Sequence, residues 1–120
     1  MGRGMFIGSP FDWARYKITQ ATTAAPAIGS TAFNSIAGLD AAPALARTGT
    51  GVYTITAANS GTPFTAGKTF VKVTPSNAAA RVCSVVYTST SVITLSFFDA
   101  ATPSAADSGD FDLQIEIYNP

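Results

Sequence analysis

The most regular pattern in this chain lies near its C-terminus, in residues 110–118. Large apolar side chains alternate there with polar or amphipathic ones. One face comprises Phe111, Leu113, Ile115 and Ile117, and the other comprises Asp112, Gln114, Glu116 and Tyr118. A strict period of two predicts a strand with one face in the core and the other exposed to water or paired with a basic neighbour. Such a strand needs others beside it, which restricts the fold to those that contain a sheet.

Four further segments after Arg47 also have the composition of strands. They are residues 52–57, 68–74, 81–88 and 91–98, and they are rich in β-branched and aromatic side chains. Clusters of turn-forming residues separate them, at 59–63, 66–67 and 75–77. The short link at 89–90 predicts that the strands on either side form an antiparallel hairpin. Recurring short strands without a convincing helix predict an all-β domain, either an antiparallel β-sandwich or a small β-barrel.

The chain before Arg47 has a different character. Residues 1–12 contain three glycines and a proline without any period, and we interpret them as an extended N-terminal arm. Residues 13–19 alternate and predict a first strand, with Ala14, Tyr16 and Ile18 on one face. Residues 20–46 are rich in Ala, Thr and Pro and predict an irregular connecting segment, within which residues 27–39 fit a helical turn, a loop or a strand about equally. We place the sandwich core of this single domain at residues 47–120.

The composition favours a protein that works in an assembly. Hydrophobic residues make up 47% of the 120 residues and charged residues only 12%, against about a quarter in an ordinary soluble domain. The surface therefore consists largely of small uncharged side chains, which suit burial against other subunits. No apolar run reaches the roughly 18 residues that a membrane span needs, and we expect no membrane partner.

Charge is distributed unevenly along the chain. The first 98 residues hold all seven basic residues and two acidic ones, and the remaining part holds five acidic residues. Such a split serves either pairing within the fold or contact between neighbouring subunits. We favour pairing within the fold. The net charge of zero and the few cations near Trp13 make a weak basic surface, so we expect no nucleic-acid partner.

The residues that usually carry catalysis are scarce. There is no histidine, and the single Cys83 lies within a predicted strand without a neighbouring base. We therefore expect neither an enzyme nor a bound cofactor. Asp107, Asp110 and Asp112 offer carboxylates to a calcium ion, but they lack the spacing of a calcium-binding loop. An ordinary turn before the last strand explains these three residues better.

Large apolar side chains near the N-terminus predict a partner interface. The candidates are Phe6, Ile7 and Phe11 in the arm and Trp13, Arg15 and Lys17 on the outer face of the first strand. An apolar terminus either folds back or docks on a neighbour, and a single tryptophan beside it is more often an interface anchor than a sugar-binding residue.

Three segments together resemble a known group of proteins. They are residues 47–56 (RTGTGVYTIT), 70–74 (FVKVT) and 110–115 (DFDLQI). Over residues 47–118 the chain resembles the small β-modules of tailed-bacteriophage virion proteins, most closely the head decoration, or capsid cement, proteins. The resemblance implies a structural protein of the virion, assembled in the host cytoplasm, that forms homo-oligomers, often trimers, and binds the major capsid protein on the outer capsid surface. The alternative is a tail-fibre or receptor-binding module that recognises host glycans through Trp13 or loop residues.

Overall fold

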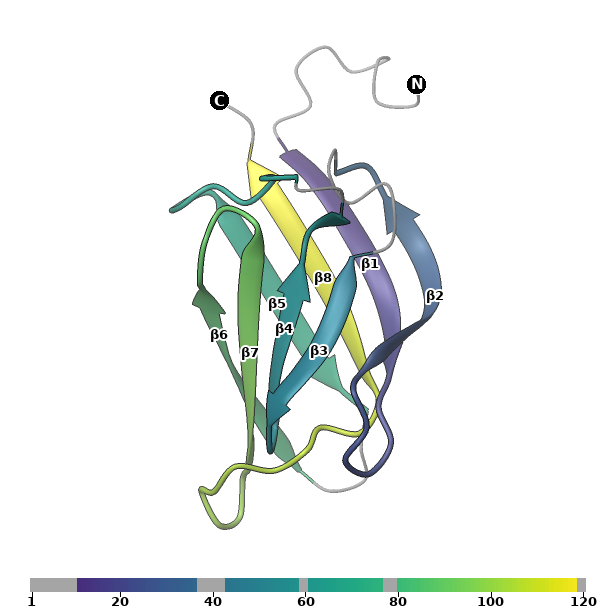
Figure 1. Cartoon of the computed structure of the whole chain (residues 1–120), viewed down its shortest axis with the longest axis vertical. Helices are drawn as coiled ribbons and strands as arrows, with labels where there is room; N and C mark the ends of the chain where they lie inside the picture. Colours follow the sequence, from purple (N-terminus) through teal and green to yellow (C-terminus); the bar gives the residue numbers. More distant parts are fainter. Residues whose placement is uncertain (1–10, 37–42, 59–60, 77–79, 119–120) are drawn as a thin grey trace.

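The computed structural model describes residues 11–36, 43–58, 61–76 and 80–118. These residues form eight strands and no helix, so none of them provides a helix able to cross a membrane. The strands are β1 (Phe11–Thr19), β2 (Ala27–Asn34), β3 (Ala44–Gly49), β4 (Val52–Thr56), β5 (Thr69–Pro75), β6 (Arg81–Tyr87), β7 (Val92–Asp99) and β8 (Phe111–Tyr118). All neighbouring strands pair antiparallel, in two four-stranded sheets of order β2-β1-β8-β5 and β3-β4-β7-β6 (Figure 1).

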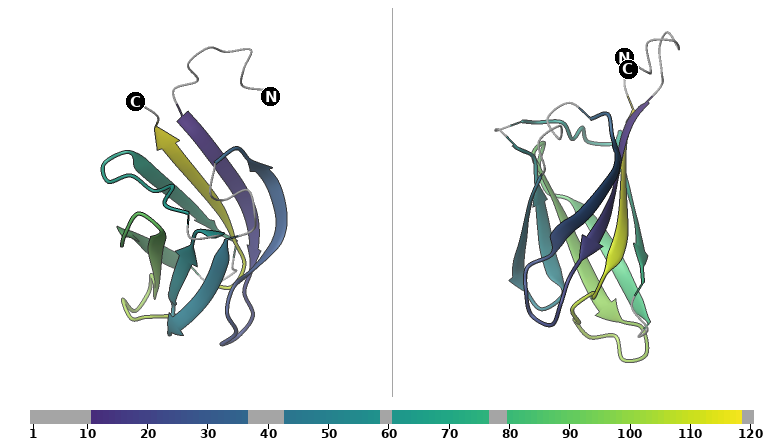
Figure 2. Two further views of the ribbon diagram at one scale, coloured as in Figure 1. Left: turned by 45° about the horizontal axis from the view of Figure 1, so that its top comes forward. Right: turned by 90° about the vertical axis from the view of Figure 1, so that its right-hand side faces the viewer.

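The two sheets pack face to face, which confirms the predicted all-β class and decides it in favour of the sandwich. The left view of Figure 2 separates the layer that contains β1, β2 and β8 from the layer of β3, β4, β6 and β7. Core side chains come from both inner faces, and the four central strands β1, β4, β7 and β8 contribute most of them. The buried apolar residues of these strands are Ala14, Tyr16, Ile18, Tyr53, Ile55, Ile93, Leu95, Phe97, Phe111, Leu113, Ile115 and Ile117. Alternation in the sequence predicted the inward positions of β8, and in β1 it placed Ala14, Tyr16 and Ile18 on one common face.

The first and last strands of the described chain lie side by side in the middle of one sheet. Phe11 pairs with Tyr118 and Ile18 with Phe111, so β1 and β8 are in register over their whole length. The core therefore does not begin at residue 47. The prediction of a core confined to residues 47–120 is wrong, because β1 supplies Tyr16 and Ile18 to it.

Residues 20–46, predicted to be an irregular connection, contain strand β2, and β3 begins within them. β2 pairs with β1 at the edge of its sheet. The register shifts twice, between Arg15 and Tyr16 and between Lys17 and Ile18. The strand shows no clear alternation because it is an edge strand, and Ile28 is its only described side chain packed against the core. Of the predicted arm, residues 1–10 lie outside the described residues, and Phe11 and Asp12 already belong to β1.

The stretch around Arg47 is a hairpin rather than the entry to one strand. Thr50 and Gly51 join β3 to β4, and Gly51 has a φ angle of +70°. A Cβ atom at Gly51 would overlap the carbonyl oxygen of Ala106 and would lie 2.7 Å from that of Phe97. The backbone of the 100–110 segment thus lies directly on the turn, where only glycine fits.

Replacing Gly51 with alanine should destabilise the fold by roughly 2–4 kcal/mol, since the substitution adds left-handed strain to a backbone overlap. Gly49→Ala is the matched control, because nothing lies within 4 Å of a Cβ atom at that position. Urea unfolding of the two variants measures the difference. Equal free energies of unfolding for both variants would contradict the close approach at Gly51.

Candidate binding surfaces

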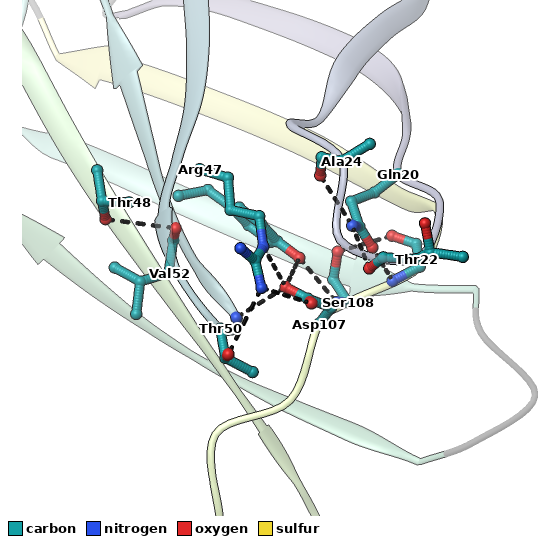
Figure 3. A network of polar contacts seen from close by, with 12 residues as sticks. Gln20, Thr22, Ala24, Arg47, Thr48, Thr50, Val52, Asp107 and Ser108 are labelled. Carbon is teal, nitrogen blue, oxygen red and sulfur yellow. Dashed lines mark hydrogen bonds and ion pairs between the residues drawn. The ribbon is translucent and has the colours of Figure 1, made fainter.

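A polar cluster around Asp107 joins three loops at one end of the sandwich (Figure 3). The carboxylate of Asp107 accepts hydrogen bonds from Nε and Nη2 of Arg47, both at 3.0 Å. It also accepts the backbone N–H of Gly51 at 2.8 Å and the hydroxyl of Tyr53 at 3.0 Å. The Arg47–Asp107 pair is largely buried, with 21% and 16% of the two side chains exposed. Four donors on one carboxylate fix the position of the chain just before β8.

The neighbouring residues extend this cluster to the turn between β1 and β2. The buried amide of Gln20 accepts the N–H of Gly109 at 2.8 Å and donates to the carbonyl oxygens of Thr22 and Ala24, both at 3.0 Å. Ser108, which is fully buried, donates its N–H to the hydroxyl of Tyr53 at 2.9 Å. The cluster is therefore a structural connection whose groups satisfy each other.

The carboxylates of Asp107, Asp110 and Asp112, weighed above as calcium ligands, do not share a common partner. Asp107 binds Arg47, Asp110 accepts the N–H of Gln20 at 2.9 Å, and Asp112 pairs with Lys17 at 3.0 Å. Each carboxylate thus faces a different partner. No group of three or more acidic, cysteine or histidine side chains that could hold a metal ion occurs in the described part of the chain.

Cys83 lies on the inner side of β6, half-buried against the core. Burial raises the pKa of its thiol to about 11, which keeps it protonated near neutral pH. This environment is that of a small apolar core residue and gives no support to a thiol nucleophile.

The uneven charge distribution is used within the fold. The ion pairs Lys17–Asp112, Arg47–Asp107 and Arg81–Asp99 each join a base of the first 98 residues to an acid of the last part. Arg81 also donates through Nε to the backbone oxygen of Asp107 at 2.9 Å. The favoured interpretation, pairing inside one chain, is confirmed for these three pairs.

The predicted interface residues that the structure describes lie on the outer face of the sheet β2-β1-β8-β5. Trp13 is half-exposed, and Arg15 and Lys17 are exposed beside it on β1. The structure brings Arg15 close to Lys72 of β5, around a hollow of about 190 Å³. Phe6 and Ile7 lie outside the described residues, and the side chain of Phe11 is not described. Lys72 was not among the predicted interface residues, because only the sheet register shows that β5 and β1 lie on either side of β8.

Among the residues that the structure describes, the outer face of the other sheet carries no charged side chain, and we call it the uncharged face. It is made of the outward positions of β3, β4, β6 and β7. They are Ala44, Ala46, Thr48, Val52, Thr54, Thr56, Val82, Ser84, Val86, Val92, Thr94, Ser96 and Phe98. Its largest apolar side chains are well exposed: Val82 at 54%, Val86 at 49% and Phe98 at 36%. The sequence holds a partial signal, because the outward polar positions of these strands carry only Thr and Ser, whereas Arg47, Arg81 and Asp99 of the same strands take part in ion pairs.

Comparison of the chain with protein-family models, with curated proteins and with solved structures gives no match. The resemblance to phage virion modules over residues 47–118 therefore stays a prediction.

The ion pair at Asp107 should make stability depend on pH. Hydrogen bonds from Arg47, which outweigh the effect of burial, hold the pKa of the Asp107 carboxyl below its usual value. A carboxyl whose pKa is lower in the folded state than in the unfolded state stabilises the fold. This stabilisation is complete above the pKa of the unfolded state, about 3.9, and is lost as the pH falls through the pKa of the folded state. Asp107→Asn should therefore be less stable at pH 7 and should lose less of its remaining stability between about pH 5 and pH 2.

Asp112→Asn is the matched control, because its partner Lys17 is 68% exposed and such surface pairs contribute little. Urea unfolding across this pH range measures both variants. A steep acid dependence retained in Asp107→Asn would contradict the role of this carboxylate.

Proposed function

We propose that this protein is a structural component of a virion that binds the outer capsid surface and stabilises the shell, as a homo-oligomer in which we expect three subunits. The observation that carries the proposal is the uncharged face. A surface whose described positions carry no charge can contact another protein without burying an unpaired ion, which is a costly step.

We assign the uncharged face to contact with a sister subunit. In a closed ring of identical chains, the same two surfaces meet at every contact between neighbouring subunits. If one of these surfaces carries no charge, no two like charges face each other at any of these contacts. Burial of Val82, Val86 and Phe98, which are well exposed in the single chain, supplies a hydrophobic driving force. The edge strand β6 belongs to this face and offers backbone groups to a neighbouring strand.

Binding to the shell is assigned to the N-terminal residues. Phe6 and Ile7 are large apolar side chains in a glycine-rich sequence, which suits an arm that docks on the major capsid protein. β1 starts at the same end of the sandwich at which β8 finishes, since Phe11 pairs with Tyr118 (Figure 1). The arm and the uncharged face then serve two different contacts.

A charge placed on the uncharged face should separate the subunits. Thr54→Lys puts an ammonium group in the centre of this face, next to Thr94 on β7. We expect its association constant to fall at least about tenfold, because an unpaired lysine would be buried in the contact. Light scattering after size-exclusion chromatography gives the mass of the oligomer and its dependence on concentration.

Thr74→Lys is the matched control, the same substitution on the outer face of the other sheet, where charged side chains already lie. It should associate like the unmodified chain, and thermal unfolding should show that both variants fold. A chain that is monomeric without substitution, or equal losses in both variants, would contradict the assignment.

A further inference from the structure

A hollow of about 190 Å³ lies on the outer face of the sheet β2-β1-β8-β5. Its walls carry three cationic side chains, one carboxylate, one amide and one hydroxyl. They are Arg15, Lys17, Lys72, Asp112, Gln114 and Thr74. The volume is smaller than the roughly 300–1,000 Å³ of sites for drug-sized ligands, so it suits one charged group and part of the ring that bears it.

The sheet register arranges these groups in rows across β1, β8 and β5. Arg15 and Lys72 both pair with Gln114, so two cations stand on either side of one amide. In the next row, Lys17 and Thr74 stand on either side of Asp112. Strands lie about 4.8 Å apart, which places the two cations of the first row within joint reach of a single anion above Gln114.

The two rows differ in their electrostatics. Asp112 lies 3.0 Å from the ammonium group of Lys17 and neutralises it. Within the described part of the chain, no hydrogen bond or ion pair holds the side chain of Arg15 or of Lys72. The planar guanidinium of Arg15 matches a carboxylate in two parallel hydrogen bonds, and Lys72 adds a second positive charge to the same position.

Aromatic side chains lie on the same face, in the row next to the cations of the hollow. Phe70 and Trp13 both pair with Glu116, in the row next to Arg15 and Lys72. Phe70 is 53% and Tyr118 47% exposed, and their rings meet edge to face with centroids 5.5 Å apart. Such surroundings suit a sugar ring. Its C–H groups stack on exposed aromatic rings, and its hydroxyls donate hydrogen bonds to carboxylate and amide oxygens. A simple inorganic anion would use the cations alone.

We propose that this hollow binds the carboxylate of an acidic sugar, such as a uronate unit of a polysaccharide. Arg15 and Lys72 hold the carboxylate above Gln114, Glu116 accepts sugar hydroxyls, and the ring of Phe70 supports the adjoining unit. The site lies on the opposite side of the sandwich from the uncharged face, and it does not depend on the proposed place in a virion.

Calorimetric and NMR titrations of the full chain test this site. The main probe is an oligosaccharide of alternating glucuronate and N-acetylglucosamine. The comparison probes are the same oligosaccharide with methyl-esterified carboxylates, sodium acetate and inorganic phosphate. We expect saturable binding of the acidic oligosaccharide with shifts of amides in β1, β5 and β8, and at least about tenfold weaker binding of each comparison probe.

Arg15→Gln and Lys72→Gln should each weaken binding of the acidic oligosaccharide at least about tenfold, because each removes a charge-assisted hydrogen bond. Lys68→Gln is the matched control, with the same loss of charge at a residue that does not line the hollow, and should stay within about twofold. Equal binding of the methyl ester, of acetate or of phosphate would overturn the proposal. An equal loss in Lys68→Gln, or no saturable binding of the acidic oligosaccharide, would overturn it as well.

Discussion

The fold depends on how the backbone of the 100–110 segment is held against the turn between β3 and β4. Gly51 lets the two backbones touch. The carboxylate of Asp107 accepts hydrogen bonds from the N–H of Gly51 and from Nε and Nη2 of Arg47. These contacts join one sheet to the segment that leads into β8, which is one of the two central strands of the other sheet. The hydrogen bonds from the N–H of Ser108 to the hydroxyl of Tyr53 and from Arg81 to the backbone oxygen of Asp107 reinforce this link at the same end of the sandwich.

With the layers fixed, the two outer faces of the sandwich have opposite chemistry. One sheet presents Thr, Ser, Val and Ala without a charge, and the other presents Arg15, Lys17 and Lys72 among acidic and aromatic side chains. An uncharged face loses little hydration on contact with protein, whereas cations around a hollow select a small charged ligand. The full thickness of the core separates the two surfaces, so the proposed subunit contact and the proposed binding hollow do not overlap.

The inward positions of β1, β4, β7 and β8 were predictable, because large apolar side chains at every second residue leave one arrangement in which they can be buried. β2 was not, since an edge strand buries little and its Gly29, Ser30 and Thr31 fit a loop equally well. The partners of Asp107 lie 54 to 60 residues away in sequence, and Arg15 meets Lys72 only across β8. Such contacts between distant segments follow from strand order, which alternation alone does not determine.

The central claim is that the protein covers a shell through its assembling face and its N-terminal residues. The most direct test is to count the copies of this chain relative to the major capsid protein in purified particles, by quantitative mass spectrometry with isotope-labelled peptides. A protein that covers the shell should be present in a fixed ratio to the major capsid protein, comparable with the number of capsomers. A few copies per particle, as in a tail tip, or no copies after purification, would contradict the account.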